Sequence, residues 1–397
     1  MEKKSFLYIP SFSVGYFATL LAKNYYLTNN LPARFYADDF PKLFRHNSFL
    51  LTAGHFYKKM NTFDSFGFDR KKHLVLGDSG GYQIASGALT WSNDLRYKIF
   101  NWLENNSTVA MNLDIPPRMN NIGKWDECIA QSEENFKYFY EKQTGKTEFL
   151  NVLQGTNETS YKIWYDRMKK FEFSGWAIGG AGGILYRLIS SIAVLLDGKE
   201  HLKTSNKYLH MLGSSSLSEF FILAQLQKSL NDIGSSLQVM TDSSSPSFSV
   251  AFGTYYTAAN LKKCVYSTVN VPKQKQHSID NNMFLPKTHY FDALFNNVLT
   301  PQDIFDYKEK CICVMTLHNF FVLKDTITAI NEFIYNDPYL LQEVTDPNLF
   351  IVLKSIDEMV KNDNSMKVFE KYKPAYVNAS KLFDSSDDTH INTFFEF

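Results

Sequence analysis

Cysteine is scarce in this sequence: its 397 residues contain four, Cys128, Cys264, Cys311 and Cys313. Four thiols are too few for a disulfide scaffold in so long a chain, and low cysteine usage is typical of a reducing compartment. Net charge is absent as well, because 41 basic side chains balance 41 acidic ones. This balance gives no sign of a nucleic-acid partner, although a local basic groove would not show in the sum.

Long hydrophobic runs are also missing. No apolar run reaches the roughly 20 residues that a transmembrane helix needs, and Pro10 and Ser11 interrupt the first apolar stretch too early for a signal-peptide core. The chain has no internal repeats, heptads or low-complexity blocks. These absences favour a cytoplasmic protein and exclude a membrane partner.

Short apolar runs are present instead, each ending in polar or glycine residues and followed by a helix-like segment. Seven are recognised, at 49–54, 73–78, 109–114, 149–155, 175–180, 208–213 and 237–242. Strands that alternate with helices indicate a parallel α/β fold, and seven or eight such units favour a (β/α)8 TIM barrel. Residues 126–142 and 218–230 are predicted helices, the second capped by Ser218.

The predicted organisation is a barrel over residues 1–338 and a helical extension packed on it over 339–397. From about 255 to 318 the sequence becomes polar and proline-punctuated, without a clear period. We expect an irregular insertion late in the barrel there.

Chemistry-bearing residues follow five of the predicted strands: Asp78, Asp114, Gln154, the pair Gly179 and Gly180, and Asp242. The carboxyl ends of barrel strands meet on one face, where active sites lie. Carboxylates gathered there would push their pKa values apart, so that one acid keeps a proton beside an ionised nucleophile, as glycosidic bond cleavage requires. An amide and flexible glycine backbone suit a flat heterocycle.

Simpler interpretations exist for each residue alone. An aspartate after a strand is most often a helix N-cap, and Asp114 before two prolines could be a turn residue. The glycines at 179–183 lack the Lys-Ser/Thr ending of a P-loop. The shared position at successive strand ends is what favours a site.

Five motifs resemble the tRNA-guanine transglycosylase superfamily in order and approximate spacing over about residues 50–324. They are "LGDSGGYQ", "NLDIPP", "VLQG", "AIGGAGG" and "TDSSSPSFSVAF", several of them closest to the archaeal branch. The resemblance implies a TIM barrel that exchanges guanine in a polynucleotide for a 7-deazaguanine base. It assigns Asp242 as the nucleophile that forms a glycosyl-enzyme intermediate and Asp78 as the general acid/base.

The resemblance also implies a set of base-binding residues: Ser79, Tyr82, Asp114, Gln154, Gly179 and Gly180. Tyr82 takes the place of the family's usual phenylalanine and would stack on the base. Gly80 and Gly81 are expected to leave room for it.

The family's zinc cysteines are missing. Where they should stand the chain reads "YFDALFNN" (290–297), although the family's later His-Asn pair is kept at His318 and Asn319. Cys311, Cys313 and His318, with Cys264, are the alternative zinc ligands. Because Cys311 and Cys313 would not share a helix face, we predict no metal and no cofactor, with both thiols buried as small apolar groups.

The substrate is expected to differ too. The chain stops too soon after the barrel for the archaeal RNA-binding domains, and Phe248 stands where bacterial tRNA enzymes have an arginine. This combination is similar to phage-type DNA guanine transglycosylases, which modify DNA to evade restriction. The expected partners are therefore DNA and a 7-deazaguanine base, with a homodimer left open. The alternatives are the same reaction on tRNA, a non-catalytic binding subunit, and an unrelated barrel hydrolase.

Basic residues that could line a nucleic-acid groove are Arg118, Arg187, Lys262, Lys263, Lys273 and Lys275. Any one of them is more often part of a solvated face. The segment around Lys262–Lys275 is the best candidate for a DNA contact, because it follows the predicted nucleophile and mixes cations with Tyr266.

Overall fold

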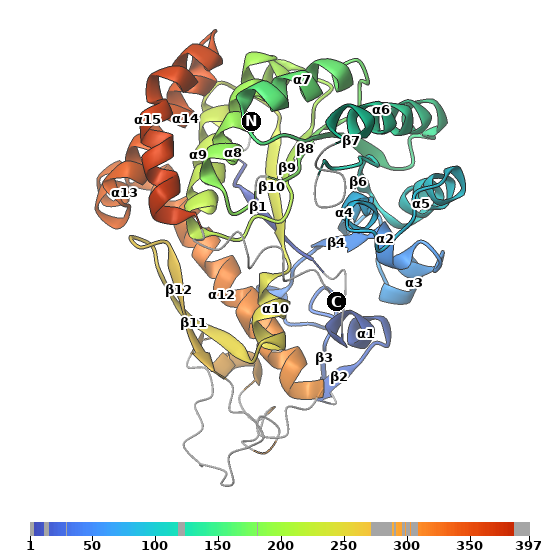
Figure 1. Cartoon of the computed structure of the whole chain (residues 1–397). Coiled ribbons are helices and arrows are strands. Elements are labelled where there is room, and N and C mark those ends of the chain that lie inside the picture. Colours follow the sequence, from blue (N-terminus) through green and yellow to red (C-terminus); the bar gives the residue numbers. More distant parts are fainter. Residues whose placement is uncertain are drawn as a thin grey trace.

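A parallel barrel of eight strands organises the chain (Figure 1). The computed structural model describes residues 4–11, 16–28, 30–117, 124–180, 182–270, 288, 289, 291–295, 298, 302 and 309–384. The barrel strands are β1 (Leu7–Pro10), β4 (Ser48–Thr52), β5 (Leu74–Asp78), β6 (Val109–Met111), β7 (Glu148–Leu153), β8 (Gly175–Ile178), β9 (Tyr208–Met211) and β10 (Gln238–Ser243). β1 pairs with β10, and a bridge between Ser11 and Leu50 brings β1 to β4. The predicted (β/α)8 fold is confirmed.

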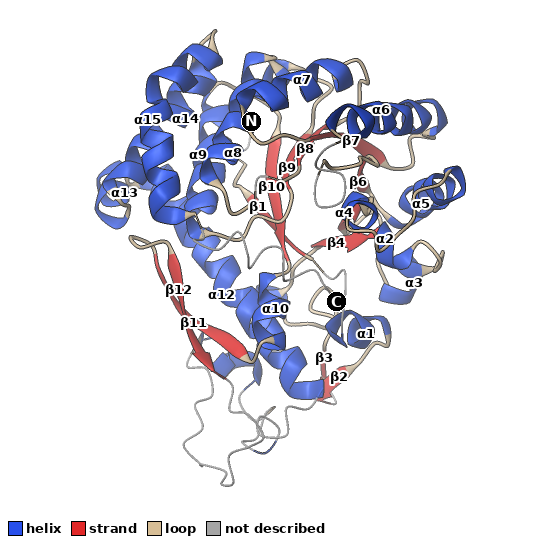
Figure 2. Cartoon of the chain, viewed as in Figure 1, coloured by secondary structure: helices blue, strands red, loops and turns tan. Residues whose placement is uncertain are grey.

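Helices alternate with these strands and cover the outside of the barrel (Figure 2). They are α1 (Tyr16–Ala22), α2 (Ala53–Phe56), α3 (Thr62–Phe66), α4 (Gly81–Ala85), α5 (Asn93–Asn106), α6 (Trp125–Lys142), α7 (Glu158–Met168), α8 (Leu185–Asp197), α9 (Leu217–Asp232), α10 (Ser245–Ala251), α12 (Glu309–Asn336), α13 (Pro338–Val344), α14 (Pro347–Lys361) and α15 (Ser365–Phe383). Short 3-10 turns span Lys42–Phe44 and Glu200–Leu202, and a π turn spans Phe291–Phe295. None of the helices in the described ranges is long and apolar enough to cross a membrane.

The strands are apolar on both faces because one face packs on helices and the other fills the barrel. A Cβ on Gly77 would meet Leu103 of α5 at 2.6 Å, so this face of β5 points outward and its neighbours Leu76 and Asp78 point inward. Leu76 pairs in register with Leu50 of β4. Asp78 therefore stands one step above an aliphatic layer, at the carboxyl end of the barrel.

The first strand was not predicted. β1 ends on Pro10, so it lacks the Gly, Asp or Gln ending that identifies the other strands. It is nevertheless central, because it fills the gap between β10 and β4. The predicted cap of α9 was wrong by two residues: Ser216, not Ser218, accepts the backbone N–H of Glu219.

The first part of the predicted irregular insertion is regular. β11 (Thr254–Asn260) and β12 (Val265–Asn270) form an antiparallel hairpin, and residues 309–318 already belong to α12. Most β12 side chains are exposed or half-exposed, so the alternation that reveals a half-buried strand is weak. The hairpin is attached to α12 by Asn319, whose Oδ1 accepts the N–H of Tyr256 at 2.8 Å.

The last three helices pack on the barrel's outer layer, α13 against α12, α14 against α9 and α15 against α8. The end of α15 also caps α8. The backbone N–H of Leu185 donates to Oδ1 of Asp384 at 2.9 Å, and that of Tyr186 donates to Oγ of Ser380 at 2.9 Å. These acceptors satisfy backbone donors that the first turn of a helix leaves unpaired.

Candidate active site at the strand ends

Asp78 and Asp242 lie at the carboxyl ends of β5 and β10, on different sides of the barrel. Each points inward with its register partner, Thr52 for Asp78 and Ile9 for Asp242. Both carboxyls therefore point into the same end of the barrel, where the negative charge of Asp242 contributes to raising the pKa of Asp78. The barrel thus brings together two residues that are far apart in the sequence.

The Asp78 carboxyl has a raised pKa, which favours its neutral, protonated form. Burial raises its pKa from 3.8 to about 6, while hydrogen bonds from the Gly80 N–H, at 3.3 Å, and from Thr52 oppose the rise. Such a group populates both protonation states near physiological pH. That is what a general acid/base needs in order to give up a proton and take one back.

Asp242 is held by one of its two oxygens. Oδ1 accepts the Gly213 N–H at 2.9 Å and lies 3.1 Å from Nε2 of His210. Oδ2 makes no hydrogen bond to any of the described residues. The side chain is therefore anchored and oriented, with Oδ2 as the oxygen that could react with a ligand.

Asp114 and Gln154 form a buried pair next along the ring of strand ends. Nε2 of Gln154 donates to Oδ2 of Asp114 at 2.7 Å, and each residue is 5% exposed. β6 ends at Met111, so Asp114 is carried by the loop three residues beyond the strand rather than by the strand itself. Carboxylate and amide oxygens accept N–H donors, such as those on the edge of a guanine-like base.

Gly80 and Gly81 of the first motif are packed against protein. A Cβ on Gly81 would lie 2.6 Å from the backbone oxygen of Asp114, and one on Gly80 would lie 2.8 Å from Cα of Gly54. The expectation that Gly80 and Gly81 leave room for a base was wrong, because neighbouring loops take that space. Their lack of side chains instead lets the loops carrying Asp78 and Asp114 approach each other.

Gly179 has the same role for Gln154. A Cβ there would lie 2.2 Å from Nε2 of Gln154, which its bond to Asp114 holds in place. Gly179→Ala is expected to displace Gln154 and lower the free energy of unfolding by about 1–3 kcal/mol through overpacking. In the Gln154→Ala background the same change should cost clearly less, which a double-mutant cycle by chemical denaturation measures. Equal costs in both backgrounds would contradict this packing.

Three other predicted base-binding residues lie near these strand ends. Ser79 is 1% exposed and its Oγ donates to the backbone oxygen of Asn112 at 3.0 Å, so it links the ends of β5 and β6. Tyr82 is half-buried in α4. Gly180 is half-buried in a left-handed conformation, φ 74°, that favours glycine. Stacking by Tyr82 and base contact at Gly180 stay predictions.

Two of the predicted basic residues lie on the β11–β12 hairpin. Lys262 and Lys263 are exposed in the turn of the β11–β12 hairpin. Their neighbour Cys264 has its pKa raised to about 12, by burial and then by the charge of Asp346, which places this turn beside the start of α14 (Figure 1). Arg118, Lys273 and Lys275 lie outside the described residues.

Three of the residues considered as alternative zinc ligands are buried in the protein interior. Cys311 and Cys313 are fully buried, and both ring nitrogens of His318 face oxygens, the Tyr256 carbonyl at 2.8 Å and the Thr288 hydroxyl at 3.4 Å. Phe291 packs edge-on against His318. The described ranges contain no group of three or more His, Cys, Asp or Glu side chains suited to a metal. The absence of zinc stays a prediction.

Two further residues, Glu219 and His210, contribute to the region of the strand ends, and the sequence analysis did not identify either of them. Glu219 is fully buried on α9; its Oε1 accepts the Gly183 N–H at 2.6 Å and its Oε2 the Ser216 N–H at 3.2 Å. Burial raises its pKa, and these donors oppose the rise. It ties the glycine loop after β8 to the loop after β9. The Ser-x-x-Glu capping box at 216–219 was the available signal.

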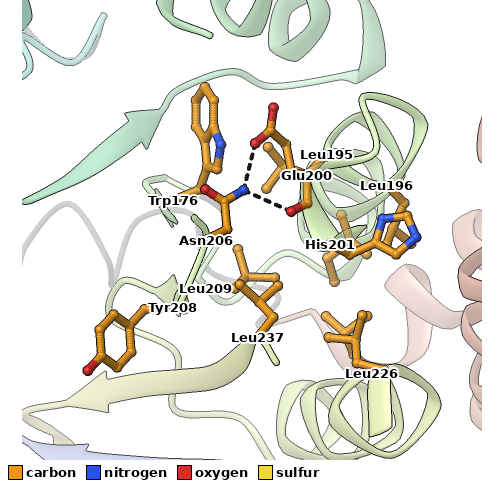
Figure 3. Close-up of a pocket in the computed structure, with 12 residues that line it drawn as sticks. Trp176, Leu195, Leu196, Glu200, His201, Asn206, Tyr208, Leu209, Leu226 and Leu237 are labelled. Carbon is orange, nitrogen blue, oxygen red and sulfur yellow. Dashed lines mark hydrogen bonds between the residues drawn. The ribbon is translucent and has the colours of Figure 1, made fainter. Parts of the chain in front are cut away.

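A small cavity of about 20 Å3 lies away from these carboxyls, between β8, β9 and the helices α8 and α9. Figure 3 shows Glu200 and Asn206 at its edge, joined by hydrogen bonds of 2.7 and 2.8 Å from the Asn206 amide. Leucines make up much of the remaining lining. This space is about the size of one water molecule and does not suit a nucleobase.

Comparison with models of known protein families gave no match, and comparison with curated protein sequences gave none either.

Proposed function

We propose that this protein exchanges guanine for a 7-deazaguanine base in DNA through a covalent intermediate on Asp242. The observation that carries the proposal is the pair of inward-pointing carboxyls at the strand ends, Asp78 with its pKa raised to about 6 and Asp242 anchored through a single oxygen. Base exchange needs such a division between a proton carrier and a nucleophile. The neighbouring Asp114–Gln154 pair supplies acceptors for the base edge.

In the proposed reaction, Oδ2 of Asp242 attacks the anomeric carbon of the sugar as the bond to guanine breaks. Protonated Asp78 gives its proton to the departing guanine. The deazaguanine then attacks the same carbon and loses a proton to Asp78, and the electron pair of the ester bond returns to Oδ2. The target nucleotide must leave the base stack to reach residues at the barrel mouth.

DNA is proposed as the polymer on two local features. Phe248, half-buried on α10, stands where the resembling bacterial tRNA enzymes have an arginine. Around His318, aromatic packing by Phe291 replaces the zinc-binding segment of those enzymes. Modified bases of this type would protect DNA from restriction.

The test incubates the protein with DNA, tRNA and 7-cyano-7-deazaguanine, then analyses the nucleosides of each polymer by mass spectrometry. We expect the deazaguanine nucleoside in DNA and none when Asp242→Ala replaces the wild-type protein. Modification found only in tRNA would show that DNA is the wrong substrate, while the proposed base-exchange reaction would still hold. Modification of neither polymer, with either this base or its aminomethyl relative, would overturn the proposal.

A further inference from the structure

His210 is a polar residue inside the barrel. It pairs in register with Ala177 of β8 and Met240 of β10, and all three share the face opposite the helices, since Trp176 and Leu209 point toward α8 and α9. Its side chain is fully buried. Imidazole is rarely placed among apolar groups without a polar partner, and here the partner is Asp242.

The surroundings of His210 fix where its proton lies. Nε2 faces Oδ1 of Asp242 at 3.1 Å and must donate, because a carboxylate oxygen only accepts. Nδ1 is buried and makes no hydrogen bond to a described residue. The hydrogen on Nε2 is therefore directed at Oδ1 of Asp242, and the ring makes no second hydrogen bond to a described residue that could compete with this one.

His210 and the Gly213 amide therefore donate to the same oxygen, Oδ1. We propose that His210 is a positioning residue that fixes Asp242 so that Oδ2 alone attacks, and that it stabilises the carboxylate released when the intermediate breaks down. This inference rests on the proposed base exchange.

The two donors favour the carboxylate over the ester. When Oδ2 bonds to the anomeric carbon, Oδ1 becomes the ester carbonyl and loses most of its negative charge, so its hydrogen bonds weaken. When the incoming base attacks, the C–Oδ2 bond breaks, its electron pair returns to the carboxylate, and both hydrogen bonds strengthen. Donation by His210 thus assists departure of Asp242 more than it assists attack.

The test uses His210→Phe, which keeps a flat ring but cannot donate, and His210→Gln, whose amide restores a donor near the position of Nε2. We expect His210→Phe to lower kcat for base exchange about 10- to 100-fold, the effect of losing one hydrogen bond to a charged group. KM should change little. The fraction of enzyme trapped as covalent adduct, seen on a denaturing gel, should rise. His210→Gln should recover kcat to within about tenfold of the wild type.

Other outcomes separate the possible failures. If His210→Phe lowers kcat and adduct together and His210→Gln does not recover them, the residue only supports the barrel and the inference is wrong. Unchanged kcat in a folded His210→Phe protein, checked by thermal unfolding, would also overturn it. If the wild-type protein exchanges no base and forms no adduct, the proposed function itself fails.

Discussion

Asp242→Asn is expected to abolish base exchange while leaving the protein folded. The asparagine oxygen can still accept from the Gly213 amide and from His210, so the anchoring of the side chain is preserved. Its amide nitrogen replaces the attacking oxygen and cannot form the ester. We expect exchange of labelled guanine into DNA to fall by about four orders of magnitude or more, as for loss of a catalytic nucleophile. Radiolabel incorporation measures it.

The same variant tests the electrostatic coupling without any substrate. The charge of Asp242 raises the pKa of Asp78, so removing that charge should lower it from its value of about 6. Carboxyl NMR titration of Asp78 in the two proteins measures the change. An unchanged pKa would show that the two groups do not interact, and exchange above about one per cent of wild type would reject Asp242 as nucleophile.

Asp78→Asn is the second large effect, because it removes the proposed proton carrier. Exchange should fall by about 10²- to 10⁴-fold, the usual contribution of general acid/base catalysis. The loss should persist across the pH range, since no proton can be gained or given. Steady-state exchange rates between pH 5 and 8 measure it. Asp64→Asn, on an exposed position of α3, is a matched control and should retain full activity.

Asp78→Asn should also alter how stability depends on pH. In the folded protein the carboxyl keeps its proton up to a pH of about 6, whereas in the unfolded chain it loses it near 3.8. Between these values the folded state binds more protons, so the free energy of unfolding falls as the pH rises. Relative to wild type, the variant should gain about 2 kcal/mol between pH 4 and 7, a value reduced because the carboxyl is partly exposed. Urea unfolding at both pH values measures the gain, and a constant difference would contradict the raised pKa.

Most of the barrel could be predicted because its strands are buried on both faces. Such strands are short continuous apolar runs, and seven of the eight lead into Gly, Asp or Gln where the chain reaches the carboxyl end of the barrel. β1 lacks this ending, since Pro10 follows its apolar residues. The β11–β12 hairpin was not predicted. Its two strands are joined by stacking of Tyr256 on Tyr266, with ring centroids 4.7 Å apart, and the sequence around either tyrosine does not indicate that the two strands pair.

The sequence allowed the individual residues of the candidate site to be predicted, but not the contacts between them. Asp78, Gln154 and Asp242 could be identified from their positions after strands. Gly179 makes space for the Gln154 side chain rather than for a ligand. This contact joins residues that follow two different strands, so it depends on the folded barrel and not on the local sequence. His210 gave no signal, because one histidine in an apolar run usually indicates a filled core position.

The capping of α8 by Asp384 has a consequence for the order in which a ribosome makes this protein. Leu185 begins α8 directly after the glycine loop, and its cap is translated 199 residues later. All eight barrel strands have emerged by then. A nascent chain can therefore close its barrel well before the first turn of α8 receives these acceptors, and we expect that end of α8 to become fully capped only when α15 docks.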